Sequence, residues 1–205
     1  MYTDKVFIRS ELQLENRSKD FLKVCDILKN LEIDYFLQGG VLLGAVRDQG
    51  FIPWDWDVEI SILHEKLLPN FEKILTRLLL EGFKISKVLT DDGQIKVDFY
   101  GSELEEVTGF TIFTWSYCAN GDYYHRRKLK IPGKYLKNFS LIKLCGIYHK
   151  TPNNVEKYLE YQYGDWQTPL KTDNKSLYLN KDFSGITIAV ILKNFAKKYI
   201  KRYLG

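Results

Sequence analysis

The chain has 205 residues, of which 45% are hydrophobic and 27% charged, and its formal net charge at pH 7 is +4. These fractions are ordinary for a soluble globular domain, and the mild positive charge suits an anionic ligand without indicating nucleic acid. Three widely spaced cysteines, which we expect to be reduced, predict neither a disulfide framework nor a zinc site. The chain has no signal-peptide core and no run of about 18 apolar residues, so we expect a cytoplasmic protein without a membrane-spanning helix.

Helical and alternating hydrophobic patterns follow one another along the chain, separated by turn residues. Neither an internal repeat nor a low-complexity tract nor a clear linker interrupts them, so we expect a single domain over residues 1–205. In chain order, the predicted elements are a helix at 11–31, a strand at 33–37, a helix at 41–46, a strand opening at 51 and running to 62, a helix at 64–81, strands at 84–89, 95–100 and 108–117, a helix from 152 to 163, and a basic amphipathic helix at 186–204.

The segment IPWDWDVEI carries the main functional signal of the sequence. Asp55, Asp57 and Glu59 stand at alternate positions, so on a strand their carboxylates point the same way. Three carboxylates on one face repel one another, and Mg²⁺, with Mn²⁺ as an alternative, is the usual compensation. Mg²⁺ sites usually serve phosphate chemistry, so the segment favours a metal-dependent enzyme over a solvated acidic face.

The apolar residues between the acids set the register of the predicted strand. Val58 and Ile60 take the opposite face from Asp57 and Glu59, which makes these two acids the predicted metal pair. We rank Asp55 below Asp57 and Glu59 as a metal ligand, because its role depends on where the strand begins. Glu59 is therefore the position on which activity is expected to depend.

Two glycines and an arginine precede the acids. Gly39 and Gly40 let the backbone approach a ligand, and the N–H groups of the helix that follows are expected to hold a phosphate. Arg47 lies between the glycines and the acids, and its guanidinium suits a diphosphate. Each also has a simpler interpretation, since two glycines also form a structural turn and an isolated arginine is more often a surface residue.

Three further side chains complete the predicted site. Asp98, in the predicted strand at 95–100, is the expected third acid, and it would either ligate the metal or accept the proton of an attacking hydroxyl. An acid at a strand edge is otherwise simply solvated. Trp54 and Trp56 would stack on a nucleobase or a sugar, or pack against the protein, and the sequence does not decide between these roles.

The stretch FLQGGVLLGAVRDQGFIPWDWDVEISI resembles the signature of the LicD family, which includes fukutin and fukutin-related protein. The family pattern is roughly G-[TSN]-x-L-G-x-x-R, a short spacer, and then G-[FV]-I-P-W-D-x-D-x-D. The later stretch TPNNVEKYLEYQYGDWQTP is similar to the family's Pro-Asn opening, helix and Tyr-Gly-x-Trp end. Together the similarities cover residues 33–170. The first stretch matches the pattern at Gly40, Leu43, Gly44, Arg47, Gly50, Ile52, Pro53, Trp54, Asp55 and Asp57.

The resemblance implies an α/β fold in which helices flank a nucleotidyltransferase-like mixed β-sheet core. It also implies a Mg²⁺-dependent transferase that moves ribitol phosphate, glycerol phosphate or phosphocholine from a CDP-linked donor. The acceptor would be a hydroxyl of a cell-surface glycan or its lipid-linked precursor, as in capsule, teichoic acid or lipopolysaccharide synthesis. Asp55, Asp57, Glu59 and Asp98 are the metal positions carried over, and Glu59 departs from the family, which has Asp there.

Two other functions stay open at this point. One is transfer of a nucleoside monophosphate to a small molecule or protein, and the other is non-catalytic glycan binding on a decayed enzyme fold, for which Glu59 is the hint. The chain shows neither the membrane anchor nor the long stem of the animal members, which favours a compact bacterial or viral-type enzyme. The helix at 186–204 would either rest on the inner face of an anionic membrane or present a solvated face.

Overall fold

The computed structural model describes the chain except residues 1–6, 92–93, 102–107, 173–177, 181–182 and 184–205. The predicted basic helix at 186–204 and its membrane contact lie outside the described residues. Among the helices that are described, none combines the length and apolar character needed to cross a bilayer.

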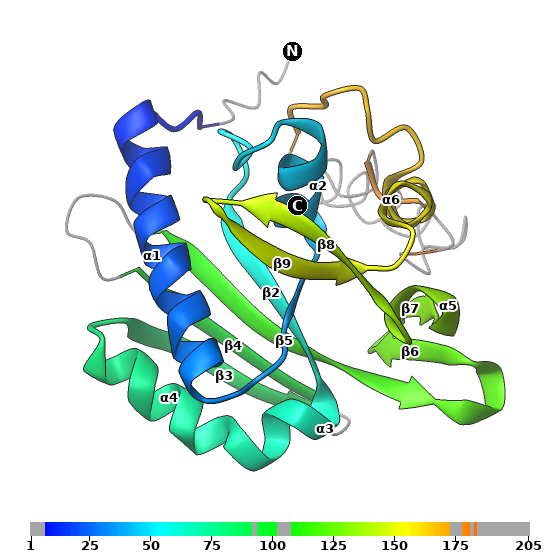
Figure 1. The fold of residues 1–205 in the computed structure, drawn as a ribbon, viewed down its shortest axis with the longest axis horizontal. Coiled ribbons are helices and arrows are strands. Elements are labelled where there is room, and N and C mark those ends of the chain that lie inside the picture. The colour runs from blue at the N-terminus through cyan, green and yellow to red at the C-terminus, as the bar shows by residue number, and fades with distance from the viewer. Residues whose placement is uncertain (1–6, 92–93, 102–107, 173–177, 181–182, 184–205) are drawn as a thin grey trace, which may run out of the picture.

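The described residues form a nine-stranded mixed sheet flanked by helices, as Figure 1 shows, and this confirms the predicted fold class. Seven strands follow the order β3-β4-β5-β2-β1-β9-β8, and β6 and β7 extend from β5. The β2–β5 and β1–β9 pairs are parallel, and the others are antiparallel. The strands are β1 (Phe36–Leu37), β2 (Asp57–Leu63), β3 (Lys84–Asp91), β4 (Gln94–Tyr100), β5 (Gly109–Cys118), β6 (Tyr123–Arg126), β7 (Leu129–Pro132), β8 (Phe139–Leu144) and β9 (Ile147–Pro152).

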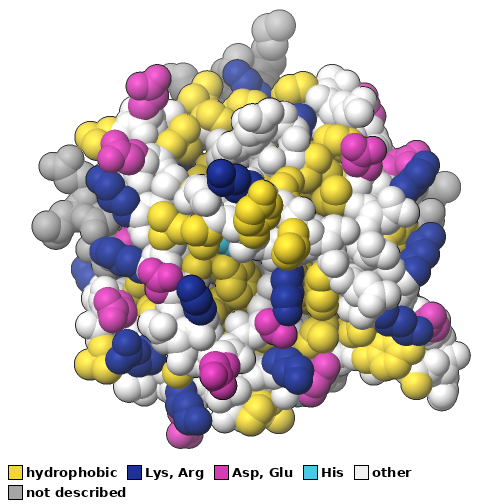
Figure 2. Space-filling model, viewed as in Figure 1, with side chains coloured by type: hydrophobic (Ala, Val, Ile, Leu, Met, Phe, Trp, Pro, Cys, Tyr) yellow, Lys and Arg dark blue, Asp and Glu magenta, His cyan; other side chains and the backbone are white. Residues whose placement is uncertain are grey.

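The helices cover both ends of this sheet. α1 packs against α4, which contacts β3, whereas α2 contacts β2 and β8 and α6 contacts β9 (Figure 1). Basic and acidic side chains are mixed over the face in Figure 2, in agreement with the mild net charge of +4. The helices are α1 (Glu11–Asn30), α2 (Gly39–Arg47), α3 (His64–Leu67), α4 (Phe71–Leu80), α5 (Gly133–Leu136), α6 (Val155–Tyr163), and the short 3₁₀ helices η1 (Leu68–Asn70) and η2 (Ala119–Gly121).

The first helix forms as its sequence predicts. Ser10 caps α1 in a capping box with Gln13, and the inner face buries Phe21, Val24 and Leu28 completely. The helix ends in a turn in which the Ile33 backbone N–H donates to the Leu28 carbonyl at 2.9 Å. That turn uses the residues predicted to start the next strand, so β1 is shorter than the predicted strand at 33–37.

The acidic strand begins later than predicted. β2 starts at Asp57 rather than at Phe51, because the preceding residues form a turn in which the Asp55 N–H donates to the Ile52 carbonyl at 3.1 Å. Within β2 the predicted register is confirmed, since Val58 and Ile60 are completely buried. Asp57 and Glu59 therefore share one face of a strand, whereas Asp55 stands before it.

Three predicted helices need correction. The helix predicted at 64–81 is interrupted by η1, where Pro69 cannot donate an intrahelical hydrogen bond and Leu68 is 57% exposed. The later helix begins at Val155, with Asn154 as its N-cap in a left-handed conformation, instead of opening at 152. The helix predicted at 41–46 begins earlier, on Gly39 itself.

Candidate functional site

Two arginines hold the turn that precedes β2. The Arg17 Nη2 atom donates to the carbonyls of Asp55 and Trp56 at 3.1 and 3.2 Å, and Arg17 is completely buried on α1. Arg9 donates to the same two carbonyls, at 3.0 Å to Trp56. These two carbonyls therefore accept hydrogen bonds from arginine side chains instead of from a neighbouring strand. The contact fixes the position of Asp55, which precedes β2 in the chain.

The acids lie against the first turn of α2. A Cβ on Gly39 would stand 1.8 Å from Glu59 Oε2, and a Cβ on Gly40 would stand 1.9 Å from Asp55 Oδ2. Gly39 also has φ of +65°, a conformation that favours glycine. The two glycines thus leave the space that the two carboxylates fill. The N-terminus of a helix favours negative charge, so this position stabilises the acids or an anionic ligand between them.

The pKa of the Asp55 carboxyl is shifted by its surroundings. Burial first, and then the charge of Asp57, raise the pKa of its carboxyl to about 6, although the Arg17 guanidinium opposes both effects. The neighbouring arginines therefore only partly offset the burial of this carboxyl and its repulsion by Asp57. A bound cation would relieve it.

A threonine that the sequence did not single out connects the acids of two strands. Thr111 on β5 stands opposite Glu59 in β2 and opposite Asp98 in β4. Its Oγ1 lies 2.7 Å from Asp98 Oδ1 and 3.2 Å from Asp57 Oδ2. Asp98 also pairs with Lys96, whose Nζ lies 2.7 Å from Asp98 Oδ1. Asp98 is thus linked to the site through Thr111, with a lysine as its ion partner.

The acids do not form a closed ligand set on their own. Among the described residues, no group of three His, Cys, Asp or Glu side chains lies close enough to hold a metal ion. Asp55, Asp57 and Glu59 line one cavity, whereas Asp98 does not. The metal and catalytic roles of these four acids remain predictions.

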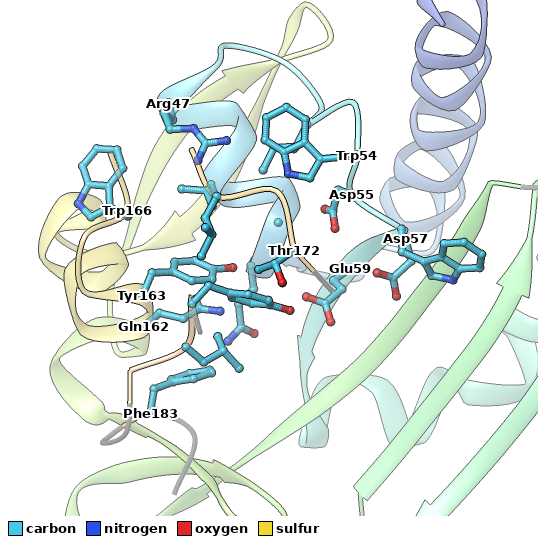
Figure 3. Close-up of a pocket in the computed structure, with 18 of the residues that line it drawn as sticks. Arg47, Trp54, Asp55, Asp57, Glu59, Gln162, Tyr163, Trp166, Thr172 and Phe183 are labelled. Atoms are coloured by element: carbon cyan, nitrogen blue, oxygen red, sulfur yellow. The ribbon is translucent and has the colours of Figure 1, made fainter. Parts of the chain in front are cut away.

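The cavity has a volume of about 1190 Å³ and lies between β2 and the chain that follows α6. In Figure 3, Asp55, Asp57 and Glu59 point into it from one side, and Gln162 and Tyr163 extend toward them from the other. The segment after α6 continues the second wall with Trp166, Thr172 and Phe183. A pocket of this size accommodates a ligand larger than a metal ion and a phosphate.

Arg47, Trp54 and Trp56 all line the cavity, but each has its own surroundings. The Arg47 guanidinium donates to Asp48 through Nε and Nη2, both at 2.8 Å, so it already has a carboxylate partner. The Lys171 Nζ lies 5.0 Å from the centre of the Trp54 ring. Trp56 is 77% exposed. The stacking and phosphate-binding roles of these residues remain predictions.

Arg126 is a cavity residue that the sequence analysis missed. Its guanidinium lies 3.7 Å from the centre of the Phe113 ring, and it faces the same cavity as the acids. Burial lowers the pKa of Arg126, while the charges of Glu59 and Asp57 oppose the shift. The β5–β6 hairpin brings this cation to the site, and the sequence pattern of the hairpin does not indicate that Arg126 faces the acids.

A buried polar network fixes the elements around the cavity. The Gln38 Nε2 donates to the Tyr158 hydroxyl at 2.6 Å, and its Oε1 accepts from Ser61 at 2.6 Å and from the Trp115 Nε1 at 2.8 Å. Gln38 precedes α2, and the other three residues lie on β2, β5 and α6. The network therefore connects four elements that carry site residues. A satisfied buried network of this kind adds rigidity and specificity.

Comparison with known proteins gives a consistent picture. The family model described as LicD/FKTN/FKRP, nucleotidyltransferase domain, matches residues 32–154. The human protein named ribitol 5-phosphate transferase FKRP is 29% identical over 153 residues, which cover 69% of this chain and 30% of FKRP. The lipopolysaccharide cholinephosphotransferase LicD of Haemophilus influenzae is 47% identical over 34 residues, which cover 17% of this chain and 13% of LicD. The chain thus spans less than a third of either relative.

Solved structures resemble the fold more distantly. The structure of ANT(2")-Ia in complex with adenylyl-2"-tobramycin has a TM-score of 0.45 and 11% identity, covering 71% of this chain and 75% of that chain. A Cid1 poly(U) polymerase structure has a TM-score of 0.40 and 14% identity, covering 52% of this chain and 32% of that chain. Both scores lie below 0.5, so they carry no inference about the site.

Proposed function

Because the chain belongs to the LicD/FKTN/FKRP nucleotidyltransferase family, we propose that it is a transferase that moves a phospho-alcohol from an activated donor to a hydroxyl acceptor. Two relatives support this choice, since one is named a ribitol 5-phosphate transferase and the other a lipopolysaccharide cholinephosphotransferase. The donor is proposed to be a CDP-linked alcohol, and the acceptor a cell-surface glycan or its lipid-linked precursor. Such a precursor would place the reaction at the inner face of the membrane.

One structural observation carries the proposal. Asp55, Asp57 and Glu59 converge with the first turn of α2 on one wall of a cavity of about 1190 Å³. Carboxylates and a helix N-terminus attract opposite charges, so together they suit a cation and the phosphates it accompanies. Gly39 and Gly40 allow Glu59 and Asp55 to approach the helix this closely.

The residues of this wall fit Mg²⁺ or Mn²⁺. Carboxylate oxygens are the ligands that these ions prefer, and Mg²⁺ typically takes one or two carboxylates together with substrate phosphates. Asp57 and Glu59 would hold the ion, with Asp55 assisting, because the repulsion felt by Asp55 calls for a nearby cation. When bound, the ion would neutralise the charge that develops on the phosphates during transfer.

The proposed reaction is an in-line substitution on the β-phosphorus of the donor, the atom that bears the alcohol. The acceptor oxygen bonds to this phosphorus, the bond to the bridging oxygen breaks, CMP leaves, and a site carboxylate takes the hydroxyl proton. The backbone N–H groups at Gly39 and Gly40 would orient the donor phosphates. Arg47 would contribute only after exchanging its Asp48 partner for a phosphate. Asp98 would act through Thr111 on the position of Asp57.

The test is an assay with CDP-ribitol, CDP-glycerol and CDP-choline, each with Mg²⁺ and glycerol as a simple acceptor, beside ATP and CTP. We expect CMP release from at least one CDP donor, dependent on Mg²⁺ and lost in Asp57→Asn. Nucleoside monophosphate transfer from ATP, without CMP release from a CDP donor, would identify a nucleotidyltransferase proper. Absence of any turnover, with no calorimetric binding of Mg²⁺ or CDP, would indicate a non-catalytic protein.

A further inference from the structure

The wall opposite the acids contains a buried amide whose oxygen has no bonding partner. Gln162, near the end of α6, is 4% exposed and lines the cavity. Within the described part of the chain, its Oε1 atom accepts no hydrogen bond. Buried side-chain oxygens are nearly always bonded, because leaving one unpaired costs free energy. In a cavity of this size, such an oxygen indicates a ligand that donates a hydrogen bond.

A buried donor faces the same cavity. The Arg126 Nε has no hydrogen-bond partner among the residues the structure describes. Arg126 lines the cavity together with Glu59 and Gln162, and the charges of Glu59 and Tyr158 both act on it. Tyr158 stands one helical turn before Gln162, so both α6 residues share a helix face. The cavity therefore presents a cationic donor near the acids and an amide acceptor on the opposite wall.

Two aromatic rings that line the cavity each have a cationic side chain of the protein near their face. The Arg126 guanidinium covers the Phe113 ring at 3.7 Å, and the Lys171 Nζ lies 5.0 Å from the Trp54 ring centre. A quaternary ammonium ligand binds most strongly over such aromatic faces. These two faces are therefore not open to a choline headgroup, but Tyr163 and Trp166 also line the cavity, so selection against choline depends on Gln162.

We propose that Arg126 and Gln162 form a subsite for a phosphorylated polyol, with Arg126 donating to a phosphate oxygen and Gln162 accepting from a hydroxyl. The site then selects ribitol phosphate or glycerol phosphate over phosphocholine. A polyol supplies the hydroxyl that Gln162 lacks, whereas a trimethylammonium group has no hydrogen to donate and would leave the buried oxygen unpaired. This selectivity rests on the proposed function, because it concerns the alcohol of the same donor.

Calorimetric titration of the whole chain with CDP-ribitol, CDP-glycerol and CDP-choline in Mg²⁺ tests the subsite without requiring turnover. Gln162→Leu removes the amide at similar volume, and we expect it to weaken CDP-ribitol and CDP-glycerol about tenfold or more, leaving CDP-choline nearly unchanged. Arg126→Met should weaken all three, because they share the phosphates, and Arg126→Lys should recover part of the loss. The matched controls are Gln167→Leu and Arg127→Met, since both side chains are exposed and neither lines the cavity.

The outcomes distinguish failure of the polyol subsite from failure of the proposed transferase function. Wild-type protein that binds CDP-choline as tightly as CDP-glycerol, or Gln162→Leu that weakens all three donors equally or none, would overturn the subsite and leave the transferase proposal standing. Failure of every CDP compound to bind would overturn both. If Gln162→Leu does not fold by its thermal midpoint, Gln162→Glu serves instead. Its carboxylate attracts the choline cation, so selectivity should shift toward CDP-choline, and an unchanged preference would count against the subsite.

Discussion

Replacing Gly40 with alanine tests whether the acids beside the first turn of α2 perform the chemistry. The new Cβ would stand 1.9 Å from Asp55 Oδ2, whereas ordinary van der Waals contact begins at 3.4 Å. The carboxylate would therefore have to withdraw by about 1.5 Å, the difference between these two distances. The Asp55 Cγ would stand 2.6 Å from the new Cβ, so the whole carboxyl group has to rotate away, and the backbone atoms are not among the clashing atoms.

The effects on stability and on activity should therefore differ. Alanine gains about 0.5–1 kcal/mol over glycine in a helix, which offsets part of the steric cost, so the free energy of unfolding should change by less than about 1 kcal/mol. A displacement of about 1 Å near the reacting atoms costs roughly 100-fold in rate, so CMP release should fall by about that factor. Thermal unfolding and CMP release on the same preparation measure both quantities.

Gly44 of the same helix provides the matched control. A Cβ at Gly44 would stand 2.4 Å from the Gly50 carbonyl oxygen, a backbone atom that cannot withdraw alone. Gly44→Ala should therefore lower the free energy of unfolding by about 1–3 kcal/mol while the folded fraction keeps its activity. Full activity in a folded Gly40→Ala protein would refute the reasoning, because the displaced Asp55 carboxylate would then be irrelevant to transfer.

Three further predictions concern the acids and their support. Glu59→Gln should abolish CMP release with an unchanged thermal midpoint, and full activity would place the metal site elsewhere. Thr111→Val should lower the turnover rate about tenfold by releasing Asp98 and Asp57, while Thr111→Ser keeps the hydroxyl and the rate; equal rates would remove the positioning role. Because the pKa of Asp55 is raised to about 6, the metal-free folded protein binds an extra proton between about pH 4 and 6. Its free energy of unfolding should fall, by an amount on the order of 1 kcal/mol, as the pH rises through that window, and Asp55→Asn should remove this contribution; identical pH profiles would contradict it.

Elements with strong local signals follow the sequence closely. α1 has a capping box and a regular apolar face, and the β3–β4 pair combines alternating residues with a turn. α6 ends where Gly164 follows Tyr163, as predicted. In each case neighbouring residues alone determine the structure, so a sequence is sufficient to predict it.

The departures arise where distant residues compete with the local pattern. The alternation of acids suggests a strand from Phe51, but Arg9 and Arg17 take the carbonyls of Asp55 and Trp56, and pairing with β1 and β5 begins only beyond them. The β8–β9 hairpin was not predicted either. Both turn residues, Cys145 and Gly146, have positive φ, and because cysteine is an uncommon choice there, Gly146 is the only turn signal in the sequence.

The residues of the site also fall into a group that the sequence predicts and a group that only the structure reveals. Its acids and glycines are adjacent in the sequence, so their pattern was readable, whereas Thr111, Arg126 and Gln162 come from three other elements. They reach the cavity through the β2–β5 pairing, the β5–β6 pairing and the packing of α6. A polar residue on a strand or helix face gives no sign of which cavity it will face. These three positions therefore required the structure.

Glu59 shows how a departure from the family pattern is accommodated. The pattern has Asp at this position, and a glutamate carries its carboxylate one methylene farther from the strand. In the structure this carboxylate reaches α2 and fills the space where a Cβ on residue 39 would lie, with Oε2 1.8 Å from that point. Position 39 precedes the first residue of the pattern, and here it is a glycine with φ of +65°. Gly39 and Glu59 thus form a matched pair, in which the absent side chain of one makes room for the longer side chain of the other. The glutamate is therefore better explained as a repositioned carboxylate than as a sign of decay.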